Sequence, residues 1–174
     1  MKQRILCIAA ALLAALALAG CGEAGRPGIG ASAKEKAAYA LGVLGLEEEA
    51  VTSINTQTDR GGFHGDGTLF MEFTFVDDGM EEQIAADPAW QPLPPDDTVQ
   101  ALVWGLETAA GSNGPFLADE EGAPLVPPVK KGYYRLIDRQ EQTDTSLLER
   151  GSFNFTVAVY DAEARVLYFG ELDT

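Results

Sequence analysis

The sequence predicts an α+β domain, with an antiparallel sheet of about five strands and one or two helices packed on one face. Apolar side chains alternate with other residues in 68–76 and 152–160, which is the period of a half-buried strand. They recur at helical spacing in 97–106, at Val99, Leu102, Val103 and Leu106. Strands and helices of these kinds favour separate layers around one core.

Five strands are expected along the chain. The β-branched segment 51–58 would pair with 68–76 across a Gly-rich loop, and 132–139 would form a third strand. The last two, 152–160 and 165–172, would form a C-terminal hairpin around the turn 161–164.

Two helices are expected. Residues 33–46 are rich in Ala and Leu, and Ser32 is a suitable N-cap, although Gly42 and Gly45 disfavour a helix. Asp97 is the expected cap of a helix over 97–106.

Shorter or irregular segments connect these elements. A short helical turn is expected over 81–86, and four prolines indicate a rigid connector over 87–95. The Gly- and Pro-rich stretch 111–131 predicts a long loop or a weak hairpin.

The first twenty residues predict a secretory signal. Lys2 and Arg4 precede an apolar run from Ile5 to Ala19, and small residues end it. A charged start, a short apolar run and small residues at its end are typical of a cleaved export signal. The run is also shorter than the roughly 20 residues needed to span a membrane.

The signal ends in Leu18-Ala19-Gly20-Cys21, which resembles the lipobox of bacterial lipoproteins. The resemblance implies that the Cys21 thiol receives a diacylglycerol, with acyl chains such as palmitate, and that a peptidase cuts before Cys21. An ordinary signal with a chance Cys is the alternative. Two or more acyl chains give stable anchoring, so we expect a covalent lipid to hold the chain at the extracytoplasmic face of the cell membrane.

The expected organisation follows from this cut. Residues 1–20 form the signal peptide, 21–32 the lipidated Cys and a flexible Gly- and Pro-containing tether, and 33–174 a single globular domain.

The charge of the mature chain is strongly negative. Removal of Lys2 and Arg4 leaves ten of the 12 Lys and Arg residues against all 27 Asp and Glu, a net charge of −17. Nucleic acid would be repelled, because its binding requires cations that replace counterions, and anionic lipid headgroups would be repelled as well. The charge serves solubility or attracts cations or a basic partner.

The two cysteines exclude several chemistries. Cys7 lies in the signal and Cys21 would carry the lipid. The mature domain then has no disulfide, catalytic Cys, zinc–thiolate or iron–sulfur site, and we expect no cofactor.

The segment from Asp59 to Gly67 is the candidate binding loop, with Asp59, Phe63, His64 and Asp66 as its candidate residues. Its glycines allow close backbone approach to a ligand. His64, the only His in the chain, is either a general base oriented by an Asp, a metal ligand together with the Asp carboxylates, or a carbonyl cap in a tight connection between strands. The i, i+2 spacing matches no established metal loop, so no catalytic or metal residue is assigned.

Three acidic clusters stand at the ends of predicted elements: 77–78, 96–97 and 119–121. Helix caps and solvated turns are one interpretation, and paired carboxylates that act as acid and base, as in a glycosidase, are the other.

The segments Gly61-Gly62-Phe63-His64-Gly65-Asp66-Gly67, Gly132-Tyr133-Tyr134, Ser152-Phe153-Asn154-Phe155-Thr156 and the ending Glu171-Leu172-Asp173-Thr174 are similar to a group of small uncharacterised exported proteins of Gram-positive bacteria. The similarity covers roughly residues 50–174. Asp59-Arg60-Gly61 departs from the Asp-Thr-His-Gly start of that group, which weakens any site that needs a second His. The resemblance implies one compact domain and no particular activity.

The sequence therefore favours a membrane-anchored extracytoplasmic lipoprotein that is a non-catalytic binding or accessory protein for an unknown protein or ligand. The alternative is a carboxylate- or metal-dependent hydrolase of envelope polymers. An enzyme should gather His64 and at least two carboxylates around a concave site, whereas a flat polar loop favours binding.

Overall fold

The computed structural model describes residues 27, 30–47, 51–59, 66–109, 111–140 and 144–174. The fold is α+β, as predicted, with a six-stranded antiparallel sheet and three α-helices. In chain order the elements are α1 (Ala33–Val43), β1 (Val51–Thr58), β2 (Gly67–Phe75), α2 (Gly79–Ala86), β3 (Gln91–Pro92), α3 (Asp97–Val103), β4 (Leu106–Thr108), β5 (Gly111–Asn113), β6 (Gly132–Asp138), the 3-10 helix η1 (Leu147–Glu149), β7 (Asn154–Asp161) and β8 (Val166–Asp173).

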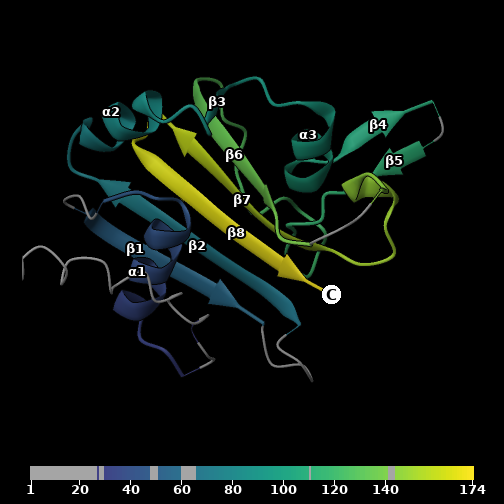
Figure 1. Cartoon of the computed structure of the whole chain (residues 1–174), viewed down its shortest axis with the longest axis horizontal. Coiled ribbons are helices and arrows are strands. Elements are labelled where there is room, and N and C mark those ends of the chain that lie inside the picture. The colour runs from purple at the N-terminus through teal and green to yellow at the C-terminus, as the bar shows by residue number, and fades with distance from the viewer. Residues whose placement is uncertain (1–26, 28–29, 48–50, 60–65, 110, 141–143) are drawn as a thin grey trace, which may run out of the picture.

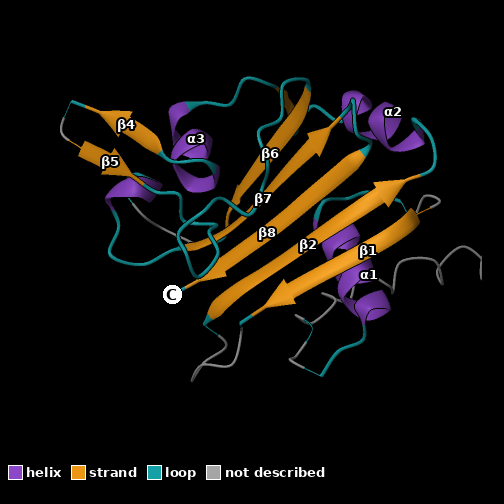
Figure 2. Ribbon diagram, turned by 180° about the vertical axis from the view of Figure 1, so that it is seen from behind, coloured by secondary structure: helices purple, strands orange, loops and turns teal. Residues whose placement is uncertain are grey.

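The strand order in the main sheet is β1-β2-β8-β7-β6-β3 (Figure 2). The predicted pairing of the first two strands is confirmed, with Ile54 opposite Phe73. The C-terminal hairpin is also confirmed, because β7 pairs with β8. The Asp161 carboxylate accepts the backbone N–H groups of Glu163 and Ala164 and so closes the turn between them.

Helices cover both faces of this sheet. α1 and α2 lie on one face (Figure 1) and pack there on the alternating side chains predicted for β2: Leu69, Met71, Phe73 and Phe75. α3 and the segment around Leu117 and Val126 cover the opposite face, against Phe155, Val157 and Val159 of β7. Two helices thus share one face, as expected, and the third covers the other.

The expectation that β7 is half-buried is wrong. Its apolar side chains do share one face, but Thr156 on the other face is 0% exposed. The reason is that α1 lies over that face, and the Tyr39 hydroxyl of α1 and the Thr156 hydroxyl donate to the same carboxylate. The period of a strand predicts its two faces, but not whether another element covers the second one.

The helix ends follow local chemistry. Ser32 caps α1 as predicted, through a capping box with Glu35. The cap of α3 is Asp96 rather than Asp97, since the Asp96 carboxylate accepts the Val99 N–H at 2.8 Å. α3 ends at Val103 instead of reaching Leu106, because Gly105 adopts a φ of +82° and the chain then forms the β4–β5 hairpin.

Candidate functional site

Two of the predicted loop residues lie within the described part of the chain. Asp59 and Asp66 are both exposed and stand on either side of the connection between β1 and β2. Cys21, Phe63 and His64 lie outside the described residues. The proposed roles of His64 and the lipid on Cys21 therefore stay predictions.

Asp59 continues the β1–β2 ladder by one residue pair. Its backbone N–H donates to the Thr68 carbonyl at 3.2 Å, and its carboxylate accepts the Thr68 N–H at 2.5 Å. A side-chain oxygen thus takes the position of a backbone carbonyl at the end of the hairpin, as Asp does in turns. This arrangement fixes where the predicted binding loop leaves the sheet.

A groove of about 440 Å³ lies beside Asp59, between the end of β1–β2 and the loop 118–125. Its lining consists of Gln57, Thr58, Asp59, Thr68, Phe70, Ala118, Asp119, Glu120 and Leu125. Three exposed carboxylates stand around the apolar side chains of Phe70 and Leu125, and no Lys or Arg is among these residues. The groove therefore suits a group that is both positively charged and partly apolar.

The acidic loop is built as a tight turn. The Asp119 carboxylate accepts the N–H groups of Glu121 and Ala123 at 3.0 and 2.8 Å, and Gly122 takes a φ of +83°. The cluster 119–121 is thus a solvated turn, which is one of the two interpretations given for it from the sequence. Asp119 and Glu120 additionally line the groove beside Asp59.

Leu117 anchors this turn to the sheet. Its side chain is fully buried over Gly170, and a Cβ built on Gly170 would lie only 2.4 Å from Leu117 Cδ1. The glycine in the central strand β8 therefore lets Leu117 approach closely. This contact places Asp119 and Glu120 opposite Asp59, which the sequence alone did not indicate.

A buried polar cluster lies at the same end of the sheet, under α1. The fully buried Glu171 accepts hydrogen bonds from the Tyr39 and Thr156 hydroxyls at 3.0 and 2.9 Å. Arg139 approaches Glu171 at 4.0 Å and pairs with Asp173 at 3.0 Å. These contacts connect α1 to β7 and β8.

This cluster was not predicted from the sequence, although the sequence contains a signal for it. Glu171 and Asp173 continue the period of Leu167 and Phe169, so they fall on an apolar face of the sheet. Acidic residues at such positions are rarely buried without partners. We interpret the cluster as structural, because its carboxylates already accept hydrogen bonds or ion pairs from the protein.

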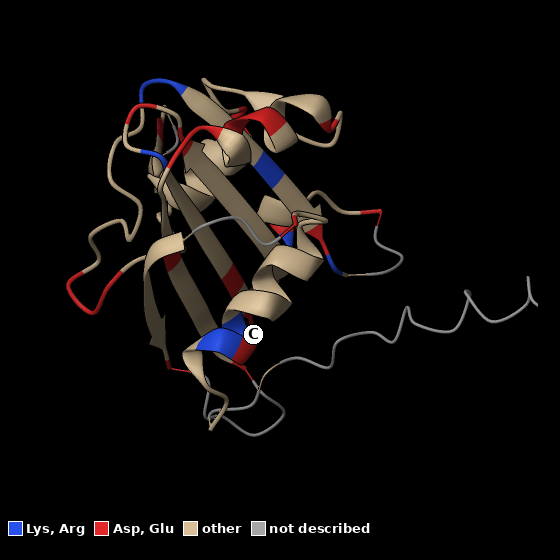
Figure 3. Ribbon diagram, turned by 90° about the vertical axis from the view of Figure 1, so that its left-hand side faces the viewer, with Lys and Arg blue, Asp and Glu red and all other residues tan. Residues whose placement is uncertain are grey.

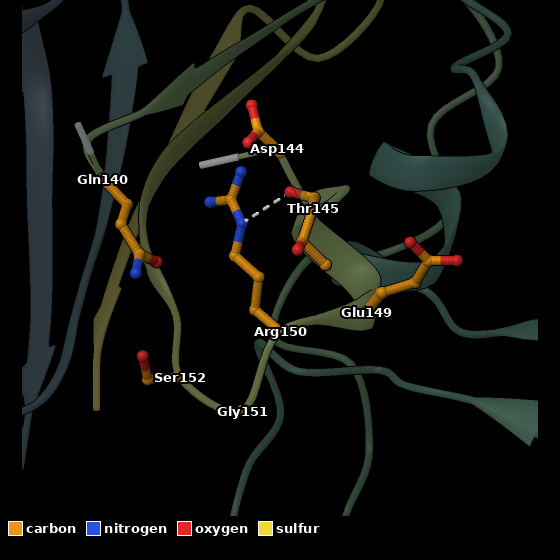
Figure 4. Close-up of a pocket in the computed structure, with 7 residues that line it drawn as sticks. All are labelled: Gln140, Asp144, Thr145, Glu149, Arg150, Gly151 and Ser152. Atoms are coloured by element: carbon orange, nitrogen blue, oxygen red, sulfur yellow. Dashed lines mark hydrogen bonds between the residues drawn. The ribbon is translucent and has the colours of Figure 1, made fainter. Parts of the chain in front are cut away.

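A wider, open cleft of about 640 Å³ lies between the end of β6 and η1 (Figure 4), lined by Gln140, Asp144, Thr145, Glu149, Arg150, Gly151 and Ser152. Arg150 is the only Lys or Arg in this lining. It binds both carboxylate oxygens of Asp138, at 2.9 and 2.7 Å, and donates through Nε to the Thr145 carbonyl. The Arg150 hydrogen bonds hold the pKa of Asp138 below its usual value. The guanidinium is therefore already occupied, and the described lining residues offer no other Lys or Arg to an anionic ligand.

The three carboxylates of the groove are exposed, and no His is among its lining residues. Among the described residues, no group of three or more His, Cys, Asp or Glu side chains is arranged to hold a metal ion. The described helices also include none that is long and apolar enough to cross a membrane.

No family model, curated protein or solved structure matches this chain. The similarity to small exported Gram-positive proteins, seen in the sequence motifs, therefore stays a prediction.

Proposed function

We propose that the chain is a lipoprotein anchored through Cys21 at the outer face of the cell membrane, and that its acidic groove binds a cationic segment of an extracytoplasmic partner. The observation that carries the binding role is the groove itself. Carboxylates from two segments about sixty residues apart, Asp59 on one side and Asp119 and Glu120 on the other, stand around an apolar floor.

The charge of the whole chain supports a cationic partner. Asp and Glu outnumber Lys and Arg by 27 to 12, and acidic positions are spread over helices and turns (Figure 3). A negative surface raises the rate of encounter with basic ligands. It also keeps the domain away from anionic headgroups, so attachment depends on the lipid.

The spacing between Cys21 and the domain supports the anchor. Ser32, the N-cap of α1, lies eleven residues after Cys21. A flexible chain of that length has a root-mean-square reach of about 18 Å. The domain would therefore work close to the membrane surface, within reach of partners embedded in the envelope.

The test of the groove uses tetralysine as the probe and the lipidated full chain in nonionic detergent. Glu120→Gln removes one carboxylate from the groove, whereas Glu121→Gln removes the same charge from the adjacent exposed residue, which does not line it. An exposed ion pair contributes about 0.2–1 kcal/mol, so we expect Glu120→Gln to weaken the affinity by up to about fivefold and Glu121→Gln by clearly less. Equal effects of the two variants in calorimetric titrations, or no saturable binding, would contradict the proposed site.

A further inference from the structure

The two edges of the main sheet differ in length and protection. β3 forms one edge with only two residues, one of them Pro92. β1 forms the other edge with eight residues, and among the described residues it pairs with β2 alone. Figure 2 shows β1 as the outermost strand on its side.

The backbone groups that β1 turns outward follow from its register. The hydrogen bond from Asp59 N–H to the Thr68 carbonyl marks a hydrogen-bonded pair, and such pairs alternate along an antiparallel ladder. Ile54 and Thr56, opposite Phe73 and Met71, therefore direct their N–H and C=O groups away from β2, toward the outer side of the strand.

The composition of this edge is unusual for a chain so rich in acidic residues. The strand reads Val-Thr-Ser-Ile-Asn-Thr-Gln-Thr, without a charge or a proline. Natural proteins usually protect a long edge strand with Lys, Pro or a covering segment, because it otherwise pairs with another strand. β1 itself contains neither Lys nor Pro, and among the described residues no segment pairs with its outer side.

An apolar groove runs along the same edge, on the α1 side. Its volume is about 630 Å³, and one cation, Lys34, stands among otherwise uncharged lining residues: Ala37, Ala38, Leu41, Gly42, Leu46, Val51, Ile54 and Phe73. Ile54 is 38% exposed, although it stands beside the buried Phe73. A strand added to β1 would place its apolar side chains in this groove, under the small residues of α1.

We propose that the strand added to β1 is the β1 of a second copy, antiparallel to the first about a two-fold axis. β1 has the pattern that the site requires, since Ile54 faces the groove while Ser53, Asn55 and Gln57 lie on the other face. Pairing of two copies would put uncharged residues opposite uncharged residues.

The symmetry of this contact determines the number of copies that assemble, and its size determines the affinity. A two-fold contact closes on itself, so it gives a dimer with one continuous sheet of twelve strands rather than a fibre. An interface made by one strand and one groove falls in the size class of weak, transient contacts. We therefore expect a dissociation constant in the micromolar range. The inference depends on neither the lipid nor the acidic groove.

Photocrosslinking of the full chain in membranes of expressing cells identifies the occupant. Asn55 is replaced by p-benzoylphenylalanine, and two differently tagged copies are produced together; Gln91 of the β3 edge, also exposed, is the matched control position. We expect a product that carries both tags, at least fivefold more abundant from position 55 than from position 91. Equal yields, or a product that joins one tag to a different protein, would overturn the second copy as occupant.

Sedimentation of the full chain in nonionic detergent tests the same contact by affinity. Thr56 turns its backbone N–H away from β2, and proline is tolerated on an edge strand where the N–H faces outward, so Thr56→Pro should fold while it removes a donor from the pairing of two copies. We expect Thr56→Pro to raise the dimer dissociation constant at least tenfold and Thr56→Val, which keeps the N–H, to leave it within twofold. A monomeric wild type at 100 μM, or equal constants for the two variants, would refute the proposal.

Discussion

Replacement of Glu171 tests whether the buried polar cluster holds α1 on the sheet. Glu171→Met keeps the length of the side chain but removes the acceptor of the Tyr39 and Thr156 hydroxyls. It also removes one of the two carboxylates that lie close to Arg139; the other is Asp173. Each buried hydroxyl that loses its acceptor costs about 1–3 kcal/mol. Loss of one member of a buried charged cluster costs about 3–5 kcal/mol.

We therefore expect Glu171→Met to lower the free energy of unfolding by about 3–5 kcal/mol, a large share of the 5–15 kcal/mol typical of a domain. Glu171→Gln retains an oxygen at the same place and should lose less. The assay is urea unfolding of the full chain in detergent, followed by far-ultraviolet circular dichroism. Glu163→Met, in the exposed β7–β8 turn, is the control and should stay within about 0.5 kcal/mol. A loss below 1 kcal/mol for Glu171→Met would refute the structural role.

Three further changes have defined outcomes. Gly132→Ala would place a Cβ 1.8 Å from the Tyr160 carbonyl oxygen, whereas the Cβ of Gly111→Ala, also at positive φ, would meet nothing within 4 Å. We expect urea unfolding to show that Gly132→Ala lowers the free energy of unfolding by at least about 2 kcal/mol and that Gly111→Ala lowers it by less. Equal losses would contradict this packing. Burial raises the pKa of Tyr160 to about 12, so the stability that its neutral hydroxyl contributes is present below pH 10 and is lost as the pH rises toward 12. Tyr160→Phe should therefore reduce the decline of the urea midpoint between pH 10 and 12. An unchanged decline would contradict the burial of this hydroxyl. Arg150 lowers the pKa of Asp138, so the free energy of unfolding of the wild type should exceed that of Asp138→Asn at pH 7. This difference should shrink as the pH falls below 3.8, the usual pKa of an Asp. A difference that grows in acid would contradict the ion pair.

The sequence was sufficient for the parts of the fold that depend on local periodicity. The alternation from Leu69 to Phe75 predicts the core face of β2, and the polar turn after Asp161 predicts the C-terminal hairpin. Both depend only on residues close together in the chain, where side-chain direction and turn chemistry are set locally.

The parts that failed depend on contacts between distant segments. The strand 152–160 was expected to be half-buried, with Thr156 on the face away from the core, but the exposure of Thr156 is decided by α1, more than a hundred residues earlier in the chain. The end of α3 was placed too late because Leu106 continues the helical period, while Gly105 and the pairing with β5 end the helix.

The candidate site was predicted in part. Asp59 was identified from the Gly-rich segment, and the structure places it on a groove. Its neighbours across the groove, Asp119 and Glu120, were recognised as an acidic cluster, either a solvated turn or paired carboxylates, but were not assigned to the same site as Asp59. Their position depends on the close approach of Leu117 to Gly170, which no local pattern in the sequence reveals.

The proposed attachment of this acidic domain to the membrane depends on a lipid on Cys21. Mass spectrometry of the amino-terminal peptide, from protein extracted from the membranes of the bacterium that makes it, tests this attachment. We expect that the first residue is Cys21 and that its sulfur carries a diacylglycerol. A mature chain that begins at any other residue, or an unmodified Cys21, would contradict it.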